Sequence, residues 1–273
     1  MILLRASGIH RRKRIKPGMP EKTATDRIVV VSRDAHCFAS ARHTHQQAQL
    51  IYAISGVVSV TTADGTWVVP PSRAVWVPAG IEHETKSHAA VQFRALLIDP
   101  AEVKGIPGVC AVVEVTPLLR ELILRLAALA ERPRGAEFER AVTRLLLLEL
   151  SFLPVEPLNL PFPRHAKLAR FCQWIQNDPA RAVALEEAAG ALHMSRSSFM
   201  RLFRREVGVS FAHWRQQARL LHALSLLAEG QSILNVALAC GYDSPSAFSA
   251  MFRRSLGRSP SEYFASPAAI KGG

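Results

Sequence analysis

Two histidines and a glutamine in the N-terminal half have spacings that suit a shared binding face. His43 and His45 are two residues apart, and Gln49 follows four residues later. Because side chains alternate along a strand, positions of equal parity can point to the same face. Imidazole nitrogens and an amide oxygen can bind a divalent metal or form hydrogen bonds to an organic molecule. These residues are therefore candidates for a ligand site.

A second group of residues suits contact with a polyanion, and it occurs twice. The segment Phe199-x3-Phe203-Arg204-Arg205-x2-Gly208-x-Ser210 returns 49 residues later as Phe248-x3-Phe252-Arg253-Arg254-x2-Gly257-x-Ser259. At this offset Ser195, Ser197, Leu185 and Ala188 align with Ser244, Ser246, Leu234 and Ala237. Guanidinium groups bind phosphates and read base edges. The duplication predicts two equivalent DNA readers.

Helical patterns position these arginines. The first copy predicts a helix over about 185–191, a turn at 192–194, and a second helix over about 196–207 that Ser195 caps. In the second copy Ser244 caps and Pro245 takes the first helical position. In each second helix the aromatic residues form one face and the polar residues another, as in a helix-turn-helix. The alternative, a buried aromatic core beside a solvated arginine face, is less compatible with two copies. The candidate DNA-binding residues are Arg196, Ser197, Met200, Arg201, Arg204, Arg205, Ser246, Ser249, Ala250, Arg253 and Arg254.

The segment between the copies also suits this arrangement. Residues 211–228 are apolar at helical intervals and contain no proline. A helix of this length spans roughly 27 Å. It could hold two recognition helices near the separation of successive major grooves, roughly 34 Å.

The N-terminal half predicts closely spaced strands, as in a β-barrel or sandwich. Runs rich in β-branched residues occur at 29–31, 50–54, 57–61, 67–69, 74–77 and 91–98, with turn residues between several of them. Tyr52, Trp67 and Trp76 are candidates to line an effector cavity, and plain core packing is the alternative for each. Trp76 alternates with its valine neighbours, so only one of the two sets faces inward, and both assignments stay open.

Beyond Pro117 the pattern becomes helical. Leucines at helical spacing predict a hairpin of two helices, broken at residues 132–135 and ending near Leu153. Its apolar surface either packs on the barrel alone or also forms a homodimer contact. Four prolines between 154 and 163 then favour a semi-extended linker and mark the domain boundary.

Charge distribution supports a nucleic-acid partner. The net charge is +12, and residues 165–273 carry thirteen basic and seven acidic side chains, whereas residues 23–164 carry fourteen of each. Residues 1–22 carry seven basic side chains and one acidic, but Met19 offers a later start, so residues 1–18 need not belong to the natural protein. Four dispersed cysteines indicate reduced thiols in a cytoplasmic protein, and no apolar run is long enough to span a membrane.

Residues of about 165–265 resemble the DNA-binding domain of AraC/XylS-type transcriptional regulators. The resemblance is strongest from Ala239 to Ser249, then at Phe252-Arg253-Arg254 and from Gly257 to Tyr263. It implies double-stranded DNA as a partner, with RNA polymerase as a further candidate. The base-reading positions that it implies are Ser197, Met200, Arg201, Ser246, Ser249 and Ala250.

One position departs from this pattern. Many relatives carry a long basic residue where this chain has Ala250. Arginine can make a bidentate contact to guanine, whereas alanine offers only an apolar contact such as one to a thymine methyl. We therefore expect Arg201 to dominate sequence reading, and Arg253 and Arg254 to contact phosphates.

The N-terminal half resembles the two cupin motifs, carried by His43-x-His45-x3-Gln49-x6-Gly56 and Pro78-x-Gly80-x2-His83. Glutamine replaces the usual glutamate. His83 would complete an uncharged set of three imidazoles and one amide, which suits zinc, nickel, copper or iron. A divalent metal, an organic effector held directly by the histidines, and purely structural histidines are the alternatives. A metal-dependent cupin enzyme, of dioxygenase or isomerase type, is the other functional reading, but no carboxylate lies in the motif to act as acid or base.

Together these patterns predict an α+β protein of two domains and a ligand-controlled, non-enzymatic transcriptional regulator. We expect a cupin-like barrel at 25–115, a helical hairpin at 116–153 as a candidate dimer interface, and a linker at 154–164. The DNA-binding domain with two helix-turn-helix units follows at 165–266, with tails at 1–24 and 267–273.

Overall fold

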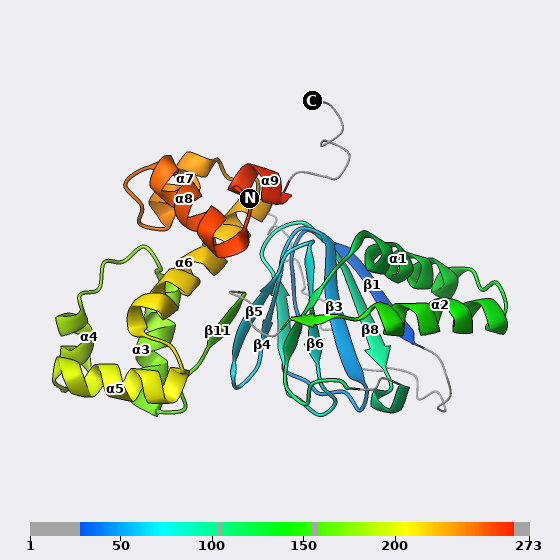
Figure 1. The fold of residues 1–273 in the computed structure, drawn as a ribbon, viewed down its shortest axis with the longest axis horizontal. Helices are drawn as coiled ribbons and strands as arrows, with labels where there is room; N and C mark the ends of the chain where they lie inside the picture. The colour runs from blue at the N-terminus through cyan, green and yellow to red at the C-terminus, as the bar shows by residue number, and fades with distance from the viewer. Residues whose placement is uncertain (1–27, 103–104, 154–157, 265–273) are drawn as a thin grey trace, which may run out of the picture.

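The computed structural model describes residues 28–102, 105–153 and 158–264, so the predicted tails lie outside the described residues. Two antiparallel sheets form the N-terminal domain (Figure 1). The first has the order β1-β8-β3-β6-β9-β10, with bounds Val29–Ala35, Val91–Ile98, Ala48–Ser55, Arg73–Val77, Ala111–Glu114 and Phe152–Leu153. The second has the order β11-β5-β4-β7-β2, with bounds Asn159–Pro161, Gly65–Val69, Val58–Thr61, Glu84–Ser87 and Phe38–Ala39.

Strand alternation divides the first sheet into two apolar faces. On β3, Ile51 and Ala53 belong to the core between the two sheets, together with Val58, Trp67 and Phe93. Leu50 and Tyr52 belong instead to a core on the opposite face, together with Trp76. Gln49 shares the parity of Ile51, so its side chain lies on the inner side.

Two helices cover that opposite face. Helices α1 (Pro117–Glu131) and α2 (Ala136–Glu149) form the predicted hairpin and lie against the strands β3 and β8 (Figure 1). Leu119, Ile123 and Leu146 are fully buried beneath them. Thr116 caps α1 and also donates a hydrogen bond of 2.7 Å to Glu149, which ties the start of α1 to the end of α2.

The remaining helices form the C-terminal domain. They are α3 (Ala166–Asn177), α4 (Leu185–Ala191), α5 (Arg196–Val207), α6 (Phe211–Ala228), α7 (Ile233–Ala239), α8 (Pro245–Leu256) and α9 (Pro260–Phe264). Ser195 and Ser244 cap α5 and α8 as predicted, each accepting a hydrogen bond from a backbone N–H of the first turn. Both helices end at a glycine in the left-handed region, Gly208 and Gly257. The predicted α+β class with a two-part helix-turn-helix domain is confirmed.

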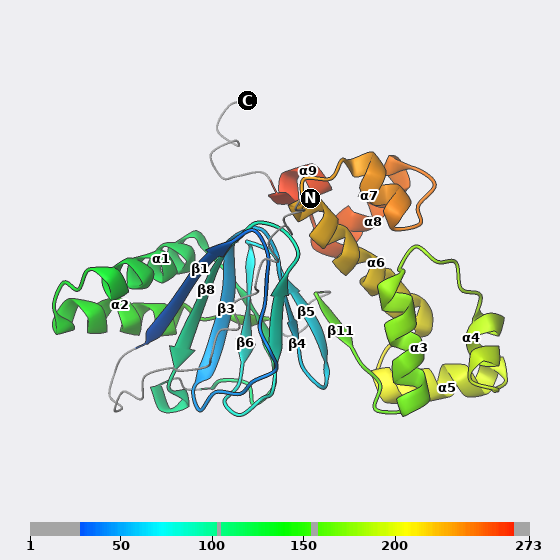
Figure 2. The same cartoon turned by 180° about the vertical axis from the view of Figure 1, so that it is seen from behind.

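The described part of the predicted linker belongs to the second sheet. Residues 159–161 form β11, which pairs with β5, and residues 154–157 lie outside the described part of the chain. Trp214 of α6 donates a hydrogen bond of 2.9 Å to the carbonyl of Pro161. Val68 and Leu160 share a core with Leu168 and Leu221, so the outer face of the second sheet packs against α3 and α6 (Figure 2). The hairpin and the helix-turn-helix domain therefore lie on opposite sides of the barrel.

Several of the short strands were not predicted from the sequence. Strand β7 reads Glu-Thr-Lys-Ser, and its polar composition gives no apolar run. Strand β11 contains a proline, which can take an edge position because no ladder donor is required there. In the described residues no helix is long and apolar enough to cross a membrane.

Candidate DNA interface and effector site

The first helix-turn-helix presents a basic face built on an aromatic core. On α5, Phe199 and Phe203 are fully buried and their rings lie 5.8 Å apart. Phe211 and Trp214 of α6 extend this cluster, with ring centroids 5.3 Å and 5.9 Å from Phe203. The predicted contact residues all lie on the exposed side of α5: Arg196, Ser197, Met200, Arg201, Arg204 and Arg205.

Ion pairs distinguish these arginines. Arg196 pairs with Glu186 of α4 at 2.7 Å, which ties the start of α5 to the preceding helix. Arg205 lies 3.7 Å from Glu206. Arg201 and Arg204 form no ion pair with another described residue. Their guanidinium groups therefore need not give up a protein partner to bind DNA.

The second unit has the same core and a different reading face. Phe248 and Phe252 are fully buried on α8, with ring centroids 5.7 Å apart. Arg253 and Arg254 are exposed in the last turn, in the places of Arg204 and Arg205. Ser246 and Ala250 are exposed, and Ser249 is half-buried. The second unit thus lacks a long side chain at the position that Arg201 takes in the first.

The structure corrects the alignment of the first helices of the two units. Helices α5 and α8 correspond at the offset of 49, but α4 and α7 correspond at 48. The buried pair Ala188 and Ala189 matches Val236 and Ala237, so Ala188 does not correspond to Ala237. Likewise Leu185 corresponds to Ile233, whereas Leu234 is 52% exposed. The second turn holds one extra residue before its serine cap.

Each turn contains one residue in the left-handed region. In the second unit this is Gly241 (φ 72°), but in the first it is His193 (φ 55°). The same hydrogen bonds surround both: Met194 N–H donates to Ala189 O, and Tyr242 N–H donates to Ala237 O. This pattern ends a helix and redirects the chain into the next one. A Cβ on Gly241 would lie 2.7 Å from the carbonyl oxygen of Ala180, so glycine is required there for space as well.

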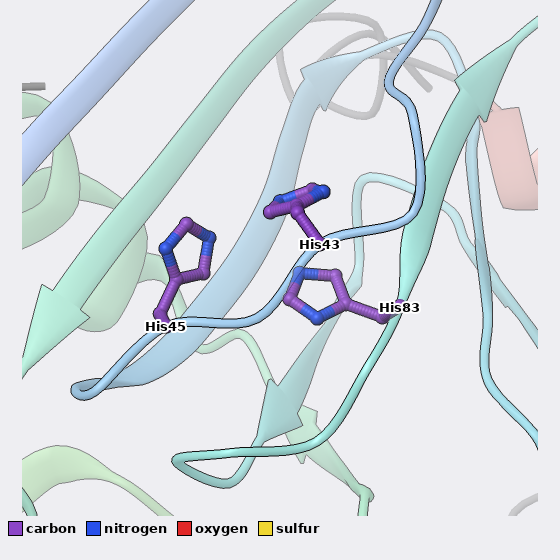
Figure 3. A group of neighbouring side chains, drawn as sticks. All are labelled: His43, His45 and His83. Carbon is purple, nitrogen blue, oxygen red and sulfur yellow. The ribbon is translucent and has the colours of Figure 1, made fainter. Parts of the chain in front are cut away.

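The structure brings the three predicted histidines together at one end of the barrel. His43 and His83 face each other across an antiparallel bridge, with backbone hydrogen bonds of 3.0 Å and 2.9 Å in the two directions. One ring nitrogen from each of His43, His45 and His83 lies within 4.8 Å of the others (Figure 3). Among the described residues this is the one cluster that could hold a metal ion.

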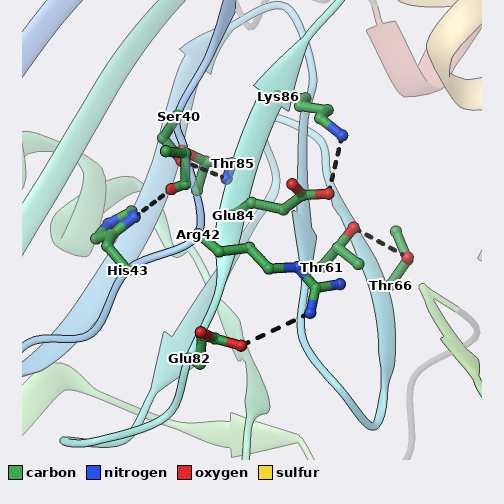
Figure 4. A network of polar contacts seen from close by, with 10 residues as sticks. Ser40, Arg42, His43, Thr61, Thr66, Glu82, Glu84, Thr85 and Lys86 are labelled. Carbon is green, nitrogen blue, oxygen red and sulfur yellow. Dashed lines mark hydrogen bonds and ion pairs between the residues drawn. The ribbon is translucent and has the colours of Figure 1, made fainter. Parts of the chain in front are cut away.

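Backbone carbonyls orient two of these rings. His43 Nδ1 donates to Ala41 O at 2.7 Å, and His83 Nδ1 donates to Ile81 O at 2.9 Å. In a neutral imidazole a protonated Nδ1 leaves a lone pair on Nε2. Sequence reasoning missed these two carbonyls because any residue type can supply one. The neighbouring side chains Arg42 and Glu82 form an ion pair of 3.6 Å beside the bridge (Figure 4).

Burial disfavours a positive charge on two of the three rings. Burial first, and then repulsion from His43 and His83, lower the pKa of His45 to about 4. Burial also lowers the pKa of His83, and the hydrogen bond to the carbonyl of Ile81 offsets this effect only in part. The Nε2 atom of His45 is buried and has no hydrogen-bond partner. Near neutral pH these two rings offer lone pairs rather than positive charge.

Gln49 lies beside this cluster. Its side chain is 7% exposed, and Oε1 lies 2.8 Å from Nε2 of His83. Two lone pairs facing each other would repel. The contact is favourable with the amide NH2 turned toward the ring, and both atoms could also bind one cation.

Tyr52 and Trp76 take the alternative of plain core packing. Tyr52 and Trp76 are fully buried, but they point away from the barrel interior, into the core beneath α1 and α2. Burial raises the pKa of Tyr52, and the nearby Arg120 of α1 partly offsets this effect. Trp67 does lie in the core between the sheets. Parity along a strand relates neighbouring side chains to each other and leaves open which set faces inward.

The fold and these two sites define a DNA-binding regulator with a separate sensory domain. Comparison with known proteins agrees. A family model for the AraC-like ligand binding domain matches residues 28–148, and one for a helix-turn-helix domain matches residues 188–266. The chain is 37% identical over 223 residues to the HTH-type transcriptional regulator NimR of Escherichia coli K12, covering 82% of this chain and 81% of NimR. This protein belongs to the AraC-type family of transcriptional regulators.

Two further similarities were found. The transcriptional regulator GadX of Escherichia coli O127:H6 is 32% identical over 191 residues, covering 70% of this chain and 66% of GadX. The solved DNA-binding domain of AdpA, in complex with a target DNA, is 35% identical and covers 38% of this chain and 96% of that domain, with a TM-score of 0.36.

Proposed function

We propose that this DNA-binding regulator reads its operator mainly through the first helix-turn-helix and is controlled by a divalent metal bound at the histidine cluster. The observation that carries the regulatory part is the convergence of three imidazoles in the sensory domain, two of which have a lowered pKa. The DNA part rests on exposed arginines at equivalent places of two helix-turn-helix units.

Arg201 is the residue that we assign to base recognition. It is exposed near the middle of α5, and its guanidinium can bond two acceptors of one guanine. Ala250 takes the equivalent place on α8 and is also exposed. Arg204, Arg205, Arg253 and Arg254 lie one turn further along their helices, where contacts to phosphates would hold both helices in register.

His43, His45 and His83 would hold the metal, with Gln49 as a fourth ligand. Two backbone carbonyls fix the ring orientations, and outer partners of this kind are common around bound metals. An ion would also supply the partner that Nε2 of His45 lacks. The metal would act as a charge that draws the four side chains together. Control of DNA binding follows if the metal-bound barrel favours one arrangement of the two domains.

An organic effector is the second candidate, because the same orphaned nitrogen could accept a hydrogen bond from a small molecule. Catalysis is less compatible with the site. The described cluster contains three imidazoles and an amide, without a carboxylate to move protons. We propose binding without turnover, in the cytoplasm, where a promoter-binding protein reaches the chromosome.

We further propose that the chain acts as a homodimer through the helical hairpin. Four large apolar side chains on α1 and α2 remain exposed: Leu118 (47%), Phe138 (39%), Leu145 (44%) and Leu148 (73%). A second copy of the chain could cover these exposed apolar side chains. RNA polymerase is a candidate partner at the promoter.

We divide the chain into the barrel (25–115), hairpin (116–153), connecting segment (154–164) and DNA-binding domain (165–266).

Metal titration with a thermal-shift readout tests the sensory part. We expect Zn²⁺, Ni²⁺ or Cu²⁺ to raise the unfolding temperature of the full chain, because an ion that binds only the folded state stabilises it. His45→Ala should abolish the shift. His88→Ala, which removes an exposed histidine of the same domain, should retain it. No shift with any metal would reject the metal and leave the organic effector.

A further inference from the structure

A cavity of about 290 Å³ lies between the two domains, outside the barrel interior. Ser59 on β4 and Thr66 and Val68 on β5 line the barrel side. Leu221, His222 and Ser225 on α6 line the helical side. Gln176 of α3 also lines it. Figure 2 shows α3 and α6 on the other side of the barrel from the hairpin. Neither the DNA surface nor the histidine cluster includes these residues.

The wall of the cavity combines an apolar part with a polar part. Val68, Leu160 and Leu221 supply buried aliphatic surface. Gln176, Glu229 and two histidines, His88 and His222, supply polar groups. Sites for small molecules often lie at domain boundaries and have this mixed lining.

The polar part favours a positive ligand. Burial lowers the pKa of His222, so its imidazole is neutral near pH 7. Glu229 lines the cavity with a carboxylate, and Asp178 lies close enough to act electrostatically on His222. On the barrel side, Lys86 pairs with Ser59 in the strand register, but its ammonium is bound to Glu84 at 2.8 Å (Figure 4). Among the described residues that line the cavity, Glu229 is the only Asp, Glu, Lys or Arg, and the other ionisable side chains are His88 and His222.

We infer that this cavity binds a small organic cation with an apolar body. The cationic nitrogen would lie toward Glu229 and His222, and the body would pack against Val68, Leu160 and Leu221. Such a ligand would touch the barrel and α6 at once. Because α6 connects the two helix-turn-helix units, binding here would act on their arrangement. This would be a second ligand site, independent of the proposed metal.

Three isosteric probes test the inference on the full chain: 2-phenylethylammonium, 2-phenylethanol and phenylacetate. Binding is followed by NMR at the ring proton of His222. We expect saturable binding of the ammonium, weaker binding of the alcohol, and none of phenylacetate. Equal binding of all three would overturn the assigned charge preference, and binding of none would overturn the site.

Substitutions in the cavity wall test whether the probe binds there. Ser225→Phe and Ser59→Phe fill the cavity from opposite walls, and each should abolish binding while circular dichroism shows a folded chain. Glu229→Gln should lower the affinity for 2-phenylethylammonium by about threefold to fivefold. The effect is modest because the carboxylate is exposed to solvent. Glu131→Gln, at the exposed end of α1, is the matched control and should have no effect. His45→Ala should also leave the probe bound, which separates this site from the metal. Unchanged binding in both phenylalanine variants would contradict the inference.

Discussion

The two helix-turn-helix units have the same buried aromatic residues but differ in their exposed residues. Phe199 and Phe203 in the first unit correspond to Phe248 and Phe252 in the second, and all four are fully buried. The exposed residues at equivalent places are Arg201 and Ala250. The shared core fixes the backbone that presents a recognition helix, whereas the exposed residues decide what that helix can read. The two copies therefore keep the same core, whereas the exposed residues of their recognition helices differ.

The largest expected effects test the shared core. Phe203→Ala and Phe252→Ala should each destabilise the protein by about 3–5 kcal/mol, because each leaves a large cavity in a packed interior. Urea unfolding measures both. A cost below about 1 kcal/mol for only one variant would show that the two cores are not equivalent.

The turns offer a sharper contrast. Gly241→Ala should destabilise by about 1–3 kcal/mol, since the added Cβ meets Ala180 O and the residue has positive φ. His193→Gly should instead stabilise by about 0.5–1 kcal/mol, because glycine adopts this conformation without steric cost. Thermal unfolding of the two variants should therefore shift in opposite directions. Shifts of the same sign would contradict the matched geometry of the turns.

The smallest effect concerns phosphate contacts. Arg254→Ala should weaken binding to all duplexes alike and reduce the slope of log K against log salt by about 1. Fluorescence anisotropy at several salt concentrations measures this slope. Arg258→Ala, an exposed arginine beyond the helix, serves as the comparison. A loss confined to one operator sequence would mean that Arg254 reads bases.

Much of this architecture follows from local sequence signals. Apolar strand runs, helical leucine spacing, serine caps and C-terminal glycines each predict their element because one local interaction decides it. Other features depend on long-range packing. The polar strand β7 and the proline-containing β11 form because neighbouring strands pair with them. The inward or outward side of Tyr52 and Trp76 depends on where the hairpin docks.

The candidate sites show the same division. His43, His45, Gln49 and His83 follow from a motif, and the structure brings them together. The sequence hides the one-residue shift between α4 and α7 because Ala237 aligns with an alanine at both offsets, with Ala188 at 49 and with Ala189 at 48. Glycine at position 241 is typical of a left-handed turn residue, but histidine at position 193 does not indicate that conformation from sequence.

The central claim is that the two recognition helices divide their work unequally, and selection of bound sequences from random duplexes tests it most directly. We expect the wild-type chain to select one half-site strongly, with each specified base pair worth about 1–3 kcal/mol. Arg201→Ala should lose preference in that half-site, whereas Ala250→Gly should change the selected sequence little. Identical base preferences for the wild type and Arg201→Ala would contradict the account.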